Sequence, residues 1–312
     1  MDSRSAAIRA FCDGLFDYAG LFPPAALDLR TAVAAYRQHR EARQSWMLGA
    51  FVVPAAQLAD LDQLLESEEQ IDLSVLVATR ATSDAYFDTL RHHLDFVRLF
   101  VAEDPVNRKV AGLETRAPQD VKPETFIDDV TKTVLNAGLD PGCTFIEVAL
   151  DLRSAELDRW TKSAAARRTM ALKARCGGVS EQDVPSSESV AAYLIACHAN
   201  GCRTKFTAGL HHPIRGMHHT GSVPMHGFIN VIGAAMLAGS VGDATGLSAI
   251  VSETDAAAFG FNEAGFSWRG HSVDETEVRR CRHEFALSIG SCSFDEPIED
   301  LTALNILPRP GQ

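Results

Sequence analysis

Short apolar runs alternate with longer segments of helical period along most of the chain. Eight runs are rich in β-forming residues and are predicted strands: Gly20–Phe22, Leu48–Val53, Asp72–Ala78, Val110–Arg116, Cys143–Leu150, Met170–Cys176, Arg203–Gly209 and Phe285–Ile289. Parallel strands need crossover connections, and the helical segments supply them. Because such crossovers are right-handed, a series of eight closes readily on itself. The pattern predicts an α/β protein with a (β/α)8 TIM barrel, and a doubly wound open sheet is the alternative.

The fourth strand has a second candidate. Phe96–Val101 is as apolar as Val110–Arg116, and the pattern alone does not choose between them. The helices are better marked at their ends. Pro123 precedes the predicted helix Glu124–Asn136, and two serines precede Val190–Ala199, which is typical of helix starts.

No Gly/Ser-rich linker, repeat or low-complexity tract divides the chain, so we expect residues 1–312 to form a single domain. An N-terminal helix is expected within 1–19. The interval between the seventh and eighth strands is the longest, and it contains an apolar helix around Phe228–Leu237 and a hairpin at Phe259–Trp268. Long segments of this kind usually cover or serve a functional site, so 210–284 is predicted to be a lid-like insert.

The charge balance narrows the class of partner. The chain has 29 Lys and Arg against 41 Asp and Glu, which gives a formal net charge of −12. A protein that binds the phosphate backbone of nucleic acids or anionic lipid is expected to carry net positive charge. We expect a small anionic metabolite as partner, with no nucleic acid and no membrane, and leave a homo-oligomer open.

Cysteine usage and the apolar runs indicate a compartment. The seven cysteines include no C-x-x-C pair, which favours reduced thiols over a zinc site. The first residues place Arg and Asp where a signal peptide needs an apolar core, and the most apolar run, Phe228–Gly242, is short and contains Asn230. These features predict a cytoplasmic protein.

Charged residues recur on one face of four consecutive predicted strands. Because side chains alternate along a strand, the following residues share these faces: Glu114 with Arg116, Glu147, Lys173 with Arg175, and Lys205 with Thr207. Charged side chains are seldom buried unless they are paired. A salt-bridge cage is one explanation. We favour a catalytic or ligand-binding site, since mutual neutralisation does not explain why ions lie on core strands.

Two lysines on adjacent strands have a specific chemical meaning. A neighbouring cation and partial desolvation both favour a neutral amine, which attacks a carbonyl carbon to form an imine. A carboxylate such as Glu147 would then move protons during formation of the carbinolamine and cleavage of a carbon–carbon bond. Lys173, Lys205 and Glu147 are therefore the candidate catalytic residues.

The last strand continues into a turn of small residues. Gly290 permits close approach of the backbone, and Ser291 and Ser293 offer hydroxyls ahead of a helix expected after Pro297. Such a turn after the eighth strand of a barrel suits a phosphate. A tight turn capped by its own serines is the alternative, and acidic residues at 295 and 296 oppose a strongly anionic ligand.

These motifs resemble a known family. Lys173 in LKARCGG, Lys205 in TKFTAG and the IGSCS turn are similar to the sixth, seventh and eighth strands of class I aldolases of the deoxyribose-phosphate aldolase type. The resemblance covers the last half of the barrel. It implies that Lys173 forms the imine, that Lys205 is the cation favouring the neutral amine, and that Gly290, Ser291 and Ser293 hold a phosphate.

The strand-six motif departs from that family, because Arg175 and Cys176 stand where the family has hydroxyl residues. Its acidic proton-shuttle residue is matched here only by two candidates, Glu147 and Glu114. The stretches DYAGLFPPA, KARCGG, TAGLHHP and GSCSFDEPIEDL also resemble a group of bacterial proteins. That second resemblance implies no activity.

Five of the eleven histidines fall within residues 211–226, beside Arg215. Histidine is the commonest metal ligand, but no H-x-H or H-E-x-x-H spacing holds two of them together. We expect His211, His212 and Arg215 to contribute to anion binding at the mouth of the barrel. A divalent metal such as Zn or Mn on Glu147, His211 and His212 is the alternative.

The sequence thus predicts an aldolase-like lyase that needs no cofactor. It would act on a small carboxylate- or phosphate-bearing carbonyl compound through an imine on Lys173, with Glu114, Arg116, Arg175 and Thr207 among the substrate-binding residues. A metal-dependent hydrolase or isomerase is the second interpretation. A non-catalytic barrel that binds a metabolite is the third.

Overall fold

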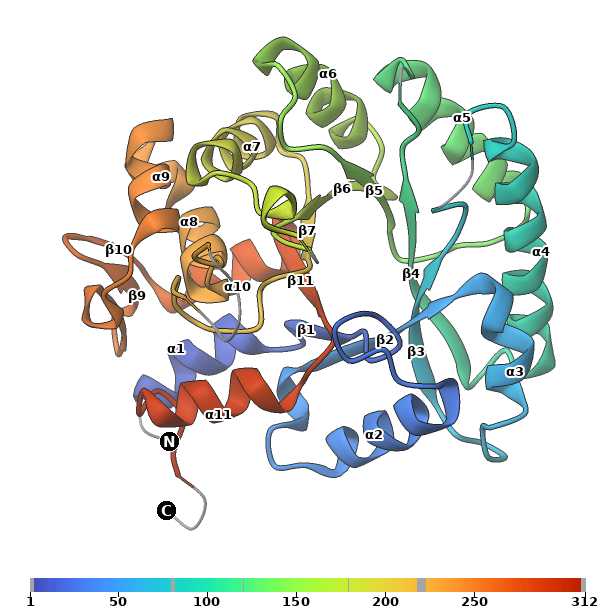
Figure 1. The fold of residues 1–312 in the computed structure, drawn as a ribbon, viewed down its shortest axis with the longest axis horizontal. Coiled ribbons are helices and arrows are strands. Elements are labelled where there is room, and N and C mark those ends of the chain that lie inside the picture. Colours follow the sequence, from blue (N-terminus) through green and yellow to red (C-terminus); the bar gives the residue numbers. More distant parts are fainter. Residues whose placement is uncertain (1–2, 80–81, 120, 179, 218–222, 310–312) are drawn as a thin grey trace.

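Eight parallel strands close into a barrel in the order β1-β11-β7-β6-β5-β4-β3-β2, with helices around the outside (Figure 1). The computed structural model describes residues 3–79, 82–119, 121–178, 180–217 and 223–309. The barrel strands are β1 (Phe16–Tyr18), β2 (Leu48–Pro54), β3 (Ile71–Leu76), β4 (Arg108–Arg116), β5 (Thr144–Val148), β6 (Met170–Arg175), β7 (Thr204–Thr207) and β11 (Ala286–Ser291). The predicted (β/α)8 TIM barrel is confirmed, and the open sheet is wrong.

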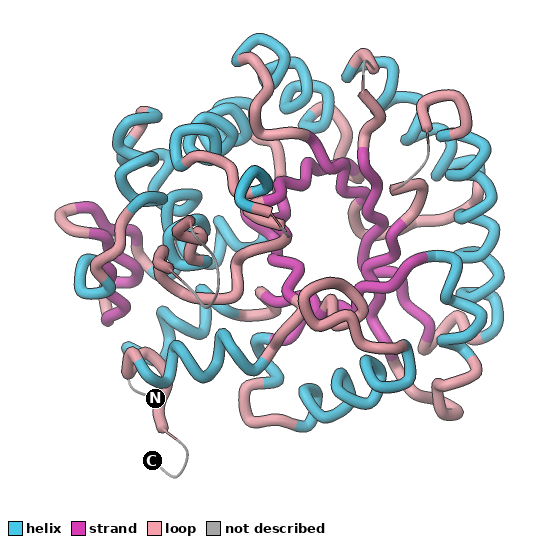
Figure 2. The backbone as a smooth tube through the Cα atoms, in the orientation of Figure 1, coloured by secondary structure: helices cyan, strands magenta, loops and turns pink. Residues whose placement is uncertain are grey.

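Figure 2 shows the ring of strands enclosed by helices. The helices are α1 (Ser3–Cys12), α2 (Leu29–Glu41), α3 (Leu58–Asp62), α4 (Tyr86–Glu103), α5 (Pro123–Asn136), α6 (Ser154–Ala165), α7 (Ser187–Asn200), α8 (Phe228–Val241), α9 (Ala244–Ser252), α10 (Glu275–Glu284) and α11 (Asp295–Ala303). Short 3-10 helices are η1 (Ser45–Met47), η2 (Ala55–Gln57), η3 (Glu181–Asp183) and η4 (Ala256–Ala258). In the described part of the chain, no helix is long and apolar enough to cross a membrane.

Local signals explain the helix ends. Pro123 occupies the first turn of α5, where its missing N–H costs nothing. The Ser186 hydroxyl accepts the Ser189 N–H at the start of α7, and Gly201 ends that helix with a left-handed φ of 65°. The last helix, α11, begins at Asp295, two residues before Pro297.

Alternation along each strand separates two environments. On β6, Leu172 and Ala174 face outward and join one hydrophobic cluster that extends from Ala7 to Leu307. Lys173 lies between them and faces the barrel interior. The main apolar core therefore lies between strands and helices. The interior of the barrel holds the charged residues together with a small apolar cluster of Cys143, Phe145 and Ala171.

Two strand assignments from the sequence are corrected. The first strand is Phe16–Tyr18, not Gly20–Phe22, and it pairs with both β2 and β11. Its central residue, Asp17, interrupts the apolar pattern and is buried because it pairs with Lys205, a partner far away in the chain. The alternative fourth strand, Phe96–Val101, belongs to α4, and β4 is the fourth strand.

Most of the predicted insert lies beside the barrel. The hairpin at Phe259–Trp268 is present and gains a third strand, forming β8 (Phe259–Asn262), β9 (Gly265–Trp268) and β10 (His271–Val273). This small sheet packs on α1, with the Phe11 ring centroid 5.1 Å from that of Phe261. The helices α8 and α9 pack on α7 (Figure 1).

The first part of the insert reaches the mouth, meaning the end of the barrel where strands have their carboxyl termini. A Cβ at Gly177 or Gly209 would lie 2.7 or 2.6 Å from the Met225 methyl, so this side chain rests on the backbone just after β6 and β7. Residues near Met225 therefore lie at the mouth. A lid role for 210–284 stays a prediction, and residues 218–222 lie outside the described residues.

Candidate active site

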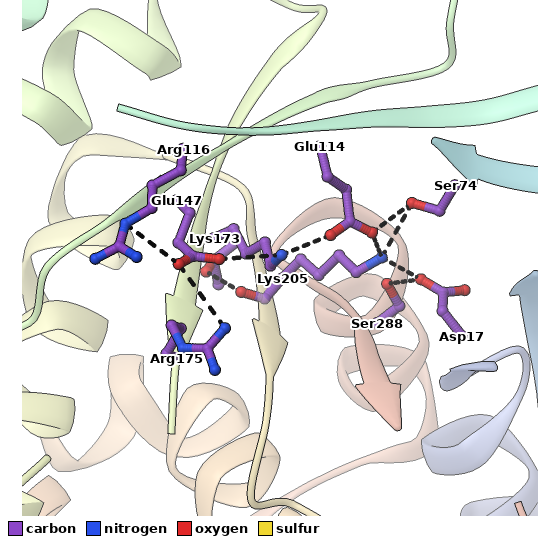
Figure 3. Close-up of polar contacts among 10 residues, drawn as sticks. Asp17, Ser74, Glu114, Arg116, Glu147, Lys173, Arg175, Lys205 and Ser288 are labelled. Atoms are coloured by element: carbon purple, nitrogen blue, oxygen red, sulfur yellow. Dashed lines mark hydrogen bonds and ion pairs between the residues drawn. The ribbon is translucent and has the colours of Figure 1, made fainter. Parts of the chain in front are cut away.

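Lys173 lies inside the barrel between two carboxylates (Figure 3). Its Nζ is 2.7 Å from Glu114 Oε2 and 3.1 Å from Glu147 Oε2. The strand register explains the contact with Glu147, because Glu147 on β5 is paired directly with Lys173 on β6. The predicted charged faces of β4, β5 and β6 thus meet in one cluster.

Lys205 occupies a more enclosed position in the same cluster. Its Nζ is 2.6 Å from Asp17 Oδ2 and 2.5 Å from Glu114 Oε1, and it donates to Ser74 Oγ at 3.3 Å. The Ser288 hydroxyl also donates to Asp17, at 2.8 Å. Glu114 therefore stands between the two lysines and offers one oxygen to each, which moderates the repulsion expected between two ammonium groups.

The charges of the innermost pair are well defined. Burial acts to raise the pKa of Glu114, but the ammonium groups of Lys173 and Lys205 outweigh it and hold that pKa well below the usual range. Burial acts to lower the pKa of Lys205, and the carboxylates of Asp17 and Glu114 raise it above its ordinary value. Glu114 is therefore a carboxylate and Lys205 an ammonium near neutral pH.

The two lysines are paired in register on neighbouring strands, but their other partners line different cavities. Asp17 and Ser74, which bind Lys205, line a cavity of about 420 Å³ at the amino-terminal ends of the strands. Glu147, which binds Lys173, lines a cavity of about 340 Å³ at the mouth. Substrates of barrel enzymes enter at the mouth, so Lys173 is the lysine that a substrate would meet first.

Two arginines border the mouth cavity. Arg116 Nε lies 3.8 Å and Arg175 Nη1 4.0 Å from Glu147 Oε1, and their side chains are 64% and 46% exposed. These separations exceed direct hydrogen-bond distance. Both predicted substrate-binding arginines are therefore at the cavity that Glu147 reaches, and each is held only loosely.

The serine hydroxyls of the turn after β11 form hydrogen bonds within that turn. Ser291 Oγ donates to the Ser293 carbonyl at 2.6 Å, and Ser293 Oγ accepts the Glu296 N–H at 3.2 Å. Gly290 packs against Thr207, since a Cβ there would lie 2.9 Å from Thr207 Oγ1. Ser293 thus caps the start of α11, and an anion site at this turn stays a prediction.

The histidines of the mouth loop are bound to neighbouring elements. His211 Nδ1 lies 3.2 Å from Glu296 Oε2, and His212 Nδ1 lies 2.5 Å from Asp300 Oδ2, both on α11. Burial lowers the pKa of His211, and the nearby Glu296 carboxylate opposes this effect. Both rings thus tie the loop after β7 to the last helix.

Arg215 and His226 hold the loop against the connection between β6 and α7. Arg215 Nη1 lies 2.9 Å from His226 Nδ1, and the Nε2 of that histidine lies 2.8 Å from the Pro185 carbonyl. Because the carbonyl needs a donor and the guanidinium needs an acceptor, His226 is neutral with its proton on Nε2. Arg215 therefore positions the loop.

The alternative metal site is not assembled. His211 and His212 face carboxylates of α11, whereas Glu147 faces Lys173 inside the barrel. Within the described ranges, no three His, Cys, Asp or Glu residues are grouped so that they could hold a metal ion. His218 and His219 lie outside the described residues.

Three residues of the cluster were missed from the sequence: Asp17, Ser74 and Ser288. Asp17 had a detectable signal, because an acidic residue in the apolar run LFDYAG is unusual unless it is paired. Ser74 and Ser288 had none, since a serine in a strand is equally common on a solvated face.

Comparison with known proteins supports the architecture. No protein-family model and no curated protein matches the sequence. The structure is similar to the tetrameric deoxyribose phosphate aldolase from Aeropyrum pernix, with a TM-score of 0.54 and 11% identity over 97% of this chain and 98% of that chain. At that identity the likeness shows the fold, a TIM barrel. The chemistry must be argued from the residues of this chain.

Proposed function

We propose that this protein is an aldolase-like lyase that forms an imine between Lys173 and a small anionic carbonyl compound. The observation that carries the proposal is the position of Lys173 between Glu114 and Glu147, with Glu147 lining the mouth cavity. The likeness in fold to an aldolase supports the same class of reaction.

Glu147 is placed to move the protons that imine formation requires. It would accept a proton from the Lys173 ammonium, which frees the lone pair to attack the carbonyl carbon and form a C–N bond. Returning a proton to the carbinolamine oxygen lets that oxygen leave as water. The product is an iminium that carries one positive charge.

The iminium then accepts electrons from the bond that breaks. A carboxylate takes the proton of the substrate hydroxyl, the adjacent carbon–carbon bond breaks, and its electron pair forms an enamine with the lysine nitrogen. One carbonyl product departs at this point. Protonation of the enamine carbon and addition of water then release the second product and restore Lys173.

Lys205 is the weaker candidate for the nucleophile. Its side chain is buried, it contacts two carboxylates and a serine hydroxyl, and the raised pKa keeps it charged. We assign it a positioning role, in which it holds Glu114 against Lys173.

The tetrameric state of the similar aldolase also suggests a homo-oligomer here, which light scattering would measure.

The experiment is reductive trapping with borohydride. The wild-type protein is incubated with a carbonyl probe such as pyruvate or dihydroxyacetone phosphate, reduced, digested and mapped by mass spectrometry. We expect a stoichiometric adduct on the Lys173 peptide. Glu147→Gln keeps the shape of the side chain but removes the base, and should slow labelling by about 100-fold or more.

Other results would point elsewhere. An adduct on Lys205, or no adduct while a carbon–carbon bond is cleaved, would contradict the imine on Lys173. A probe that raises the melting temperature and is recovered unchanged, without any adduct, would support the metabolite-binding barrel instead.

A further inference from the structure

The anionic group of the substrate has two candidate positions at the mouth. One is the turn Gly290–Ser293, and the other is the pair Arg116 and Arg175 on β4 and β6. The two positions differ in whether their donors are already engaged. That difference decides which of them is available to a ligand.

The arginine pair has donors to spare. Each guanidinium carries five N–H groups in a rigid fork. Glu147 is at 3.8 and 4.0 Å, and neither arginine has another hydrogen bond or ion pair to the described residues. Both side chains line the mouth cavity beside Glu147 (Figure 3).

The turn after β11 is less suited than the arginine pair to bind an anion. The Ser291 hydroxyl donates to the Ser293 carbonyl, and the Glu296 N–H donates to Ser293 Oγ, so these two donors of the turn are already engaged. Asp295 and Glu296 occupy the first turn of α11, where their charges repel an anion and satisfy the helix dipole.

We propose that the substrate carries a carboxylate, which Arg116 and Arg175 bind at the mouth above Glu147. A carboxylate accepts two parallel N–H bonds from one guanidinium, so the fork geometry suits it. Asp151 and Asp183 also line this cavity, so the arginine charges face nearby acidic groups. A doubly charged phosphate would meet more repulsion there than a singly charged carboxylate.

The strand register would bring a substrate carboxylate bound by the two arginines next to the carbon that Lys173 attacks. Arg116 is paired with Glu147, and Glu147 with Lys173, so these three lie at one level across β4, β5 and β6. Arg175 follows Lys173 by two residues on the same face of β6. A carboxylate adjacent to the carbonyl fits this spacing best, which makes a 2-oxo acid the substrate class. This inference rests on the proposed function.

The test compares matched probes in the trapping experiment. Pyruvate and acetone differ only in that a carboxylate replaces a methyl group, and dihydroxyacetone phosphate supplies a phosphate. We expect pyruvate to label Lys173 at the lowest concentration. Arg175→Gln and Arg116→Gln should each raise its half-saturating concentration about tenfold or more, a larger factor than for acetone, which has no carboxylate to lose. Arg98→Gln, on the outer face of α4, is the matched control.

A second probe separates the two proposals. Oxamate has the shape and charge of pyruvate but forms no imine, so its binding is measured by calorimetry. If no carbonyl probe labels Lys173 while oxamate binds and loses affinity in the arginine variants, the carboxylate site stands and the imine is wrong. If dihydroxyacetone phosphate labels best, or if pyruvate labelling ignores both arginine variants, the carboxylate site is wrong and the imine stands.

Discussion

Each oxygen of the Glu114 carboxylate contacts a different lysine, so this residue links both halves of the ion cluster. Removing one partner from such a cluster leaves a buried charge without compensation, which costs more than the pair itself contributes. The cluster is therefore both a candidate catalytic site and a point where the fold is sensitive to substitution.

Lys205→Met tests this sensitivity. The variant leaves Asp17 and Glu114 without the buried ammonium that both contact, and we expect the free energy of unfolding to fall by about 3–5 kcal/mol. Urea denaturation followed by circular dichroism measures it. Lys162→Met, an exposed lysine on α6, is the control and should change little. Adding Asp17→Asn should recover part of the loss, and no recovery would contradict the explanation.

At the scale of elements, two glycines let the mouth loop approach the strand ends. Met225 rests on Gly177 and Gly209, whose Cα atoms are themselves close, since a Cβ on one would lie 3.0 Å from the Cα of the other. Gly209 also has a φ of +74°, which favours glycine. His226, which contacts Arg215, also ties this loop to the Pro185 carbonyl.

Gly209→Ala should therefore destabilise the protein by about 1–3 kcal/mol, because it adds a Cβ in a crowded place and strains the backbone. Thermal unfolding measures the change. Gly270→Ala, where a Cβ meets no atom within 4 Å, is the matched control. Met225→Ala removes the methyl contact, so combining it with Gly209→Ala should cost less than the two single changes added together. Simple additivity would show that the contact is unimportant.

At the scale of the whole molecule, several buried or half-buried histidines make stability depend on pH. Burial lowers the pKa of four of them below the ordinary 6.5: His39, His93, His211 and His226. The folded protein thus disfavours their protonation, whereas the unfolded chain takes up protons at the ordinary pKa. Below pH 6.5 the unfolded state binds more protons, so the free energy of unfolding falls with falling pH.

We expect the melting temperature to be steady from pH 8 to about 7 and to decline from pH 6.5 to 5. Glu114 and other carboxylates with lowered pKa add to the loss only nearer their ordinary 4.5 and below. Differential scanning calorimetry in buffers of constant ionic strength measures the profile. A flat profile between pH 7 and 5 would contradict the histidine contribution.

The alternation of strands and helices along the sequence determined the architecture. Each parallel strand buries its outward face under a crossover helix, so the apolar residues of that face form a pattern within the strand's own sequence. Charged residues on β4 to β7 were also predictable, since ions on core strands stand out from their neighbours. This contrast singles out Lys173, Lys205, Glu114 and Glu147 from the sequence alone.

Only the tertiary structure decided the pairing of these charges. Asp17 on β1 pairs with Lys205 on β7 because the barrel closes. The sequence of a single strand does not show which other strands will lie near it. Lys173 and Lys205 are paired in register, and only the structure shows that their partners face different cavities, Glu147 at the mouth and Asp17 at the amino-terminal ends of the strands. The hydrogen bonds inside the turn at Gly290–Ser293 were likewise decided by the tertiary structure, because hydrogen bonding depends on backbone geometry that residue types do not specify.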